Sequence, residues 1–117
     1  MNEMIDGLLV LPGEDPVMVR FENSVKGIQK LIGGHFQALG YVGQKDWTML
    51  CDDEGKLKKL TPNFWYQGDI IVGPALFVGI NALGDDFDDL HHQMVKTIKE
   101  VMPAWREKMR LYMEVNK

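Results

Sequence analysis

Four aspartates stand close together in the second half of the chain, where no lysine or arginine occurs between Lys59 and Lys96. Such carboxylates could coordinate a hard cation, but Phe87 and Lys96 occupy places where a calcium loop needs oxygen ligands. At the start of a helix they would cap free amide groups, and on an open surface they would bind a basic protein partner. Capping is the structural expectation and partner binding the functional one for Asp85, Asp86, Asp88 and Asp89.

Histidines and the single cysteine are the other residues with chemical potential. Asp88 with His91 or His92 would supply two metal ligands from one helix face, and His35 a third from the sheet. Adjacent histidines on a helix are usually ordinary surface residues, so this metal site is the weaker alternative and no cofactor is expected. Cys51 stands among apolar neighbours, where a thiol behaves as a small hydrophobic side chain rather than a nucleophile served by His35. We therefore expect a protein that is not an enzyme.

The densest aromatic segment is Phe64-Trp65-Tyr66. In a strand, Trp65 points away from its two neighbours, so one side enters the core and the other is covered by a helix or contacts a partner. A methionine-rich apolar stripe continues beyond Pro103, further than a sheet of short strands can cover. We expect this surface to contact a protein partner or a second copy, with packing on the protein's own sheet as the alternative. Its residues are Trp65, Trp105, Met109 and Tyr112.

The elements that must position these residues follow from hydrophobic periodicity. Short apolar runs at 8–11 and 17–22 predict an opening hairpin, and Asn23 or Ser24 caps a helix that Gly33-Gly34 ends. Strands are expected at 35–39 and 64–66, a turn at 40–45, and a second hairpin at 47–60 around a polar tip. The longest β-rich run, at 69–80, is bent at Gly73-Pro74.

From residue 85 onward, apolar residues recur every three or four positions. Because Pro103 lacks an amide hydrogen, we expect two helical pieces, at 85–101 and 103–115. The fold class is therefore α+β: a small, mostly antiparallel sheet with one short helix and a long, Pro-interrupted C-terminal helix, the helices packed on one face. Residues 1–117 form a single domain, with 1–83 as its body and 84–117 as an acidic helical extension.

Composition limits the classes of function. A chain of 117 residues with 45% hydrophobic and 26% charged residues suits one globular domain. Its net charge of −4 argues against direct binding of nucleic acid. No apolar run approaches the roughly 20 residues of a membrane span. One cysteine allows no internal disulfide, and we see no signal peptide, so a cytoplasmic protein is expected.

Four short motifs follow one another along the middle of the chain: a double glycine between a helix and a strand at 31–37, E-G-K-L at 54–57, P-N at 62–63 and G-D-x-I-V-G at 68–73. In this order they resemble a small family of unknown function that is encoded largely by bacteriophages, plasmids and conjugative elements, over about residues 8–78. The resemblance implies an accessory protein in the cytoplasm of a bacterial host, and it brings no catalytic residues.

Together these observations favour a non-enzymatic protein that binds another protein, such as a host defence or replication factor. The alternative is a small ligand- or metal-binding domain with an enzymatic activity. A homo-oligomer formed through the C-terminal helix is also open.

Overall fold

The structure is a computed structural model, and it describes residues 4–40 and 46–116. Its two helices and mostly antiparallel strands confirm the α+β class. The turn expected at 40–45 lies almost wholly outside the described residues. The elements in chain order are β1 (Met4–Val10), β2 (Val17–Glu22), α1 (Val25–Ile32), β3 (Phe36–Leu39), β4 (Trp47–Asp52), β5 (Pro62–Tyr66), β6 (Asp69–Val72), β7 (Ala75–Ile80), β8 (Phe87–Asp88) and α2 (His92–Val115).

Two sheets make up the β structure. The larger sheet has the order β2-β1-β7-β4-β3, and the short strand β8 pairs with β7 beside this path. All of its pairings are antiparallel, and β1 with β2 forms the predicted opening hairpin. The second sheet is the hairpin β5-β6. Its two-residue turn places Gln67 and Gly68 at φ of 50° and 83°, as the tightest hairpin turns require.

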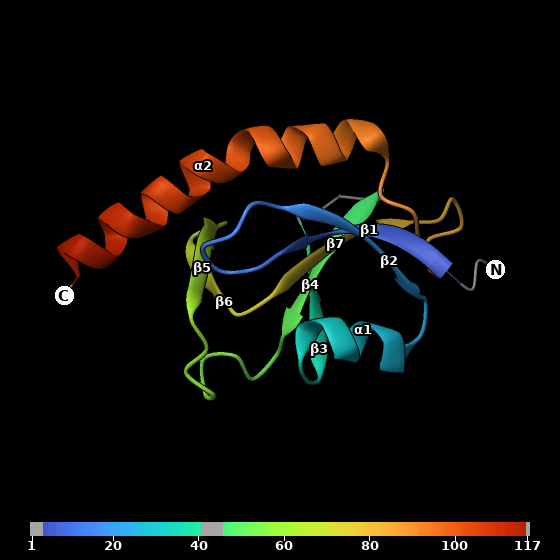
Figure 1. Cartoon of the computed structure of the whole chain (residues 1–117), viewed down its shortest axis with the longest axis horizontal. Coiled ribbons are helices and arrows are strands. Elements are labelled where there is room, and N and C mark those ends of the chain that lie inside the picture. Colours follow the sequence, from blue (N-terminus) through green and yellow to red (C-terminus); the bar gives the residue numbers. More distant parts are fainter. Residues whose placement is uncertain (1–3, 41–45, 117) are drawn as a thin grey trace.

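The two helices lie on opposite faces of the larger sheet (Figure 1). Alternate residues of the central strands feed two cores: Leu76 and Val78 of β7 face α1, whereas Phe77 faces α2 and the β5-β6 hairpin. The expectation that both helices share one face is wrong, because β1, β4 and β7 are apolar on both sides and each side needs a cover.

Helix α1 begins and ends where its sequence predicts. The Ser24 hydroxyl accepts a hydrogen bond of 2.9 Å from the Gly27 amide, which satisfies one of the free donors of the first turn. Gly33 ends the helix in the left-handed conformation, with φ of 92°. The bend predicted at Gly73-Pro74 is confirmed as well: Gly73, at φ of 75°, separates β6 from β7, which belongs to the other sheet.

The predicted hairpin at 47–60 is wrong. β4 is present, but it pairs with β3 and β7, and the residues after it form turns instead of a returning strand. The chain folds back on itself here because the Asp52 carboxylate accepts hydrogen bonds from the Glu54 amide and the Lys58 ammonium. These contacts favour a compact turn over an extended partner strand.

Helix α2 begins at His92, not at residue 85, so the expectation that the aspartates cap it is wrong. Phe87 packs into the core beneath α1, whereas Leu90 packs into the core beneath α2. One helix could not direct these neighbours to opposite faces of the sheet, and the segment is instead strand β8 and a loop. Beyond this start, α2 is one continuous helix with Pro103 inside it. It changes direction part-way along (Figure 1), as a proline inside a helix usually causes.

The N-cap of α2 is a histidine. His91 Nδ1 accepts a hydrogen bond of 3.1 Å from the Gln93 amide, and the His91 ring stacks on His92 at 4.2 Å between centroids. We expect His91→Ala to lower the free energy of unfolding by about 0.5–1 kcal/mol in urea denaturation, because the amide loses its acceptor. His92→Ala, which removes the stacking but leaves the cap, is the control. Equal losses in the two variants would contradict a capping role for His91.

Candidate functional site

Two of the four clustered aspartates, Asp86 and Asp89, hold the segment before α2 to the body of the protein, and Asp85 stabilises the turn within that segment. Asp85 accepts a hydrogen bond of 2.8 Å from the Asn81 amide group, and Asp86 accepts one of 3.2 Å from Asn23. Asp89 accepts a hydrogen bond of 2.7 Å from the backbone amide of Asp6 in β1. These bonds give the three carboxylates a structural role, although Asp85 and Asp89 remain exposed.

The proposed metal ligands do not come together. Within 4–40 and 46–116, no three His, Cys, Asp or Glu side chains are grouped so that they could hold a metal ion. Asp88 lies in β8, and His91 and His92 stack at the start of α2. The His35 ring lies 3.4 Å from the Gln29 amide group, beside the end of α1.

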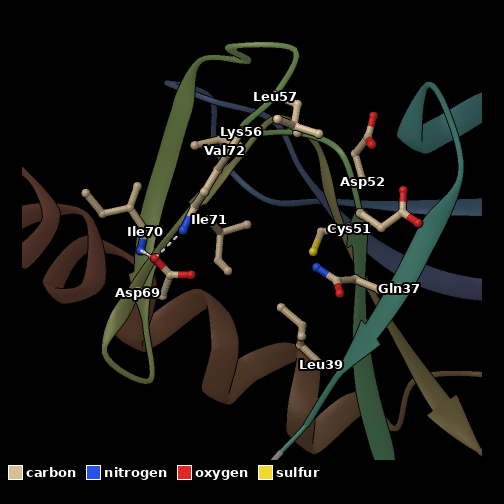
Figure 2. A pocket seen from close by; sticks show the side chains of 12 residues that line it. Gln37, Leu39, Cys51, Asp52, Lys56, Leu57, Asp69, Ile70, Ile71 and Val72 are labelled. Atoms are coloured by element: carbon tan, nitrogen blue, oxygen red, sulfur yellow. Dashed lines mark hydrogen bonds and ion pairs between the residues drawn. The ribbon is translucent and has the colours of Figure 1, made fainter.

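The Cys51 thiol borders a small hollow of about 150 Å³ between β3, β4 and β6. Figure 2 shows it pointing toward the Gln37 amide group, with Ile71 facing it from β6. Burial raises the pKa of the Cys51 thiol, and nearby carboxylates act in the same direction, against the hydrogen bond from Gln37. The thiol is therefore protonated at neutral pH and is a weak nucleophile. The Lys56–Asp69 ion pair, of 2.5 Å, lies at the same hollow.

A partly buried ion pair lies between the double glycine and the E-G-K-L segment. The Asp52 side chain is only 1% exposed and lies 2.7 Å from Lys58 Nζ. Burial alone would raise its pKa, but the hydrogen bonds from Lys58 and the Glu54 amide bring the pKa of Asp52 below its ordinary value. A Cβ on Gly34 would lie 2.5 Å from Lys58 Nζ, so the second glycine of the pair leaves room for this ion pair. The double glycine and the residues after β4 thus have a structural purpose.

Asp52→Asn should lower the free energy of unfolding at pH 7 by about 1–2 kcal/mol, because a buried charged hydrogen bond is lost while Lys58 stays partly solvated. The pKa of Asp52 is lower in the folded protein, so its contribution is present above the unfolded value of about 3.9 and disappears as the pH falls through the folded value. Urea denaturation at pH 7 and pH 3 should show the difference between variant and wild type shrinking in acid. Asp53→Asn, at an exposed neighbour, is the matched control; a pH-independent difference for Asp52→Asn would contradict the ion pair.

The P-N and G-D-x-I-V-G motifs meet at a second buried polar group. Asn63 is 1% exposed, and its amide nitrogen donates to the carbonyls of Val10 and Gly73, both at 2.8 Å. Its oxygen accepts from Arg106 of α2 at 3.1 Å, and Arg106 also donates to the carbonyls of Leu11 and Glu14. Burial lowers the pKa of the Arg106 guanidinium, and Asp15 acts in the opposite direction. This network connects β1, the open end of the β5-β6 hairpin and α2.

The aromatic side chains of β5 point alternately to the two sides of the strand, as predicted. Phe64 and Tyr66 are buried, and Trp105 of α2 packs on both, with ring centroids 5.7 Å and 5.3 Å away. Self-packing therefore accounts for Trp105. Met109 is half-buried one turn later and lines a broad groove of about 480 Å³ beside Arg106.

Trp65 lies on the outer side of β5, against the end of α2. Its ring is 4.9 Å from that of Tyr112, and Lys108 Nζ lies 5.3 Å from the Trp65 centroid. Trp65 and Tyr112 line a hollow of about 260 Å³ whose other walls include Ile70 and Val72. We call Trp65, Lys108 and Tyr112 the aromatic patch.

The last turns of α2 carry large apolar side chains that remain widely exposed in the described part of the chain. Leu111 is 48% exposed, Tyr112 45%, Met113 41% and Val115 83%. Figure 1 shows this end of α2 running past the β5-β6 hairpin, away from the larger sheet. Exposed apolar clusters of this kind are typical of protein-binding surfaces.

The expected partner-binding residues form two separate surfaces. The loop of the aspartates lies near the start of α2, and the aromatic patch lies near its other end (Figure 1). Lys108 and Leu111 were missed, whereas Met113 belongs to the predicted methionine-rich stripe. Lys108 and Leu111 lie to one side of the repeat that marks Trp105, Met109 and Tyr112. Only the position of Trp65 in the fold shows that this side of the helix borders the aromatic patch.

The net charge of α2 has the opposite sign to that of the rest of the protein. α2 carries five lysines and arginines against three glutamates, so it is net +2, and the remainder of the chain is net −6. The expected acidic character of the extension is therefore wrong for the helix itself: the acid belongs to the loop before it. None of the described helices is both long and apolar enough to cross a membrane.

Comparison with known proteins identifies one family. A family model described as a domain of unknown function, DUF3846, matches residues 5–102. No curated protein and no solved structure matches the chain at a significant level. Trp65 lies inside the matched segment, whereas Lys108 and Tyr112 follow it.

Proposed function

Because the chain belongs to the DUF3846 family, whose domain has no known function, we propose a role from its surface: it is a non-enzymatic accessory protein that binds another protein through the aromatic patch and the adjoining end of α2. The observation that carries this proposal is the set of four large apolar side chains, 41–83% exposed, at the end of α2. Aromatic and methionine side chains of this kind dominate the centres of protein interfaces.

The motifs in the middle of the chain have structural roles, which also supports this proposal. Gly34, Asp52 and Asn63 build buried polar contacts that hold the fold together. The thiol of Cys51 is buried and protonated, which does not favour nucleophilic catalysis. The surface left for function is the one that these contacts position, at the junction of β5, β6 and α2.

The setting of the protein is part of the proposal. The four motifs resemble a family of phages, plasmids and conjugative elements, and small accessory proteins of such elements act in the cytoplasm of the bacterial host. We therefore place the partner among host defence or replication factors.

Affinity capture from host cells tests the proposal. The wild type should retain a partner that the double variant Trp65→Ala/Tyr112→Ala loses, while both proteins show the same far-UV circular dichroism. A third bait, with the four clustered aspartates changed to asparagine and serine, should retain it. If the aspartate variant loses the partner and the aromatic variant keeps it, the binding surface is the acidic loop and the proposal fails.

The same exposed turns of α2 would also suit a second copy of the chain. A homodimer through α2 is therefore the second candidate. Light scattering distinguishes the two: a wild-type dimer that becomes a monomer in Leu111→Glu/Met113→Glu, which changes only exposed positions, would favour self-association, and a monomeric wild type would remove this candidate.

A further inference from the structure

Lys108 is the charged residue that stands out at the aromatic patch. Its ammonium lies over the Trp65 ring, 5.3 Å from the centroid, and no carboxylate of the described residues lies within ion-pair distance of it. The neighbouring cations are already paired: Lys56 with Asp69, and Arg110 with two glutamates of its own helix. The patch therefore presents one unneutralised positive charge beside two aromatic rings.

The hollow next to Lys108 has the size and lining of an anchor site. It measures about 260 Å³ and lies between Trp65, Tyr112, Ile70 and Val72. Pockets that hold whole drug-sized ligands are usually larger, roughly 300–1,000 Å³. A hollow of this size suits a single apolar side chain, which is how a hot-spot residue of one protein enters the surface of another.

Charge favours one sign of partner at the patch. α2 is net +2 on a remainder of −6, and beyond Arg106 it holds two cations and two glutamates. Both glutamates pair with Arg110, so Lys108 is the local attraction for an acidic segment. A basic segment would be drawn elsewhere, above all to the loop of Asp85 and Asp86.

We infer that the aromatic patch binds an acidic segment of a partner protein, which inserts one apolar side chain into the hollow and sets a carboxylate beside Lys108. This inference rests on the proposed function and specifies the chemistry of its partner. Lys108 contributes selectivity, and Trp65 and Tyr112 contribute the apolar contact.

A library of random peptides displayed on yeast provides a defined probe. Selection on the wild-type protein, with binders of Trp65→Ala removed, should enrich peptides that combine Asp or Glu with a large apolar residue. Affinities of the enriched peptides should fall about fivefold or more for Lys108→Glu. Lys96→Glu makes the same change of net charge at an exposed site on the first half of α2, and its effect should stay below about twofold. Exchanging the acidic residues of a peptide for lysine should reverse its preference between wild type and Lys108→Glu.

Other outcomes separate this inference from the proposed function. Trp65-dependent peptides that are basic or uncharged, or equally sensitive to both lysine variants, would overturn the acidic partner and leave the patch as a binding surface. If no enriched peptide depends on Trp65, both proposals fail. Self-association that Trp65→Ala abolishes, or Trp65-dependent sedimentation with vesicles of phosphatidylglycerol and phosphatidylcholine, would identify a different occupant and overturn the inference.

Discussion

Replacing Asn63 with Leu should lower the free energy of unfolding by about 3–5 kcal/mol, a large part of the 5–15 kcal/mol typical of a domain. The leucine fills the site but removes the donor shared by the buried carbonyls of Val10 and Gly73 and the acceptor of Arg106. Buried polar groups without partners carry the full cost of their lost hydration. Urea denaturation followed by tryptophan fluorescence measures the effect.

Asn116→Leu is the matched control, because Asn116 is exposed at the end of α2 and its replacement should change stability by less than about 0.5 kcal/mol. A double-mutant cycle of Asn63→Leu with Arg106→Met should show a coupling of about 1 kcal/mol or more. A loss below about 1.5 kcal/mol for Asn63→Leu, or strictly additive effects in the cycle, would contradict the network.

Trp65→Ala should weaken partner binding about 30-fold or more, since a buried aromatic anchor at an interface is typically worth about 2 kcal/mol or more. The ring is half-buried and packs against Tyr112, so the variant also loses some contact between β5 and the end of α2. Isothermal titration calorimetry with the captured partner gives the affinity, and thermal unfolding gives the accompanying change in stability.

Leu83→Ala serves as the control for this prediction. Leu83 is 84% exposed, so it matches the patch in apolar character, but it lies in the loop before β8. Its replacement should change affinity less than about twofold. Equal effects of Leu83→Ala and Trp65→Ala would show that the aromatic patch is not the centre of the interface.

Features that depend on neighbouring residues could be predicted from the sequence. Ser24 and Gly33 mark the ends of α1 through contacts within one turn. The alternation of β5 places Trp65 opposite Phe64 because the strand period is fixed. The division of the chain at Gly73 likewise follows from local backbone geometry.

Errors arose where distant contacts decide the structure. Phe87 and Leu90 fit a helical spacing, but the two faces of the sheet draw them apart, and β8 forms instead. A kink or a restart was expected at Pro103, and the helix changes direction but does not restart, because packing by Ile98, Met102 and Trp105 on either side holds one continuous helix together. Packing energy along the whole element outweighs the local penalty of a proline.

The candidate site was predictable in its residues and not in its arrangement. Trp65 and Tyr112 were both expected to contact a partner, and the structure places their rings side by side although they lie 47 positions apart in the sequence. The aspartates were expected to cap the C-terminal helix or to bind a partner, and they lie before that helix, in a segment that hydrogen bonds hold to β1 and to Asn23. Lys108 could not be predicted as a site residue, because its position over the Trp65 ring depends on the fold.

Site-specific photo-crosslinking in host cells tests the central claim most directly. A benzophenone amino acid is placed at Leu111, beside the aromatic patch, and in a separate protein at Leu83, in the loop before β8. Both positions are exposed, so neither replacement disturbs the core. We predict a crosslinked partner from position 111 that disappears when Trp65→Ala is added, and none from position 83. Crosslinks from position 83 alone, or crosslinks from position 111 that persist in the Trp65→Ala background, would contradict the assignment of this surface as the binding site.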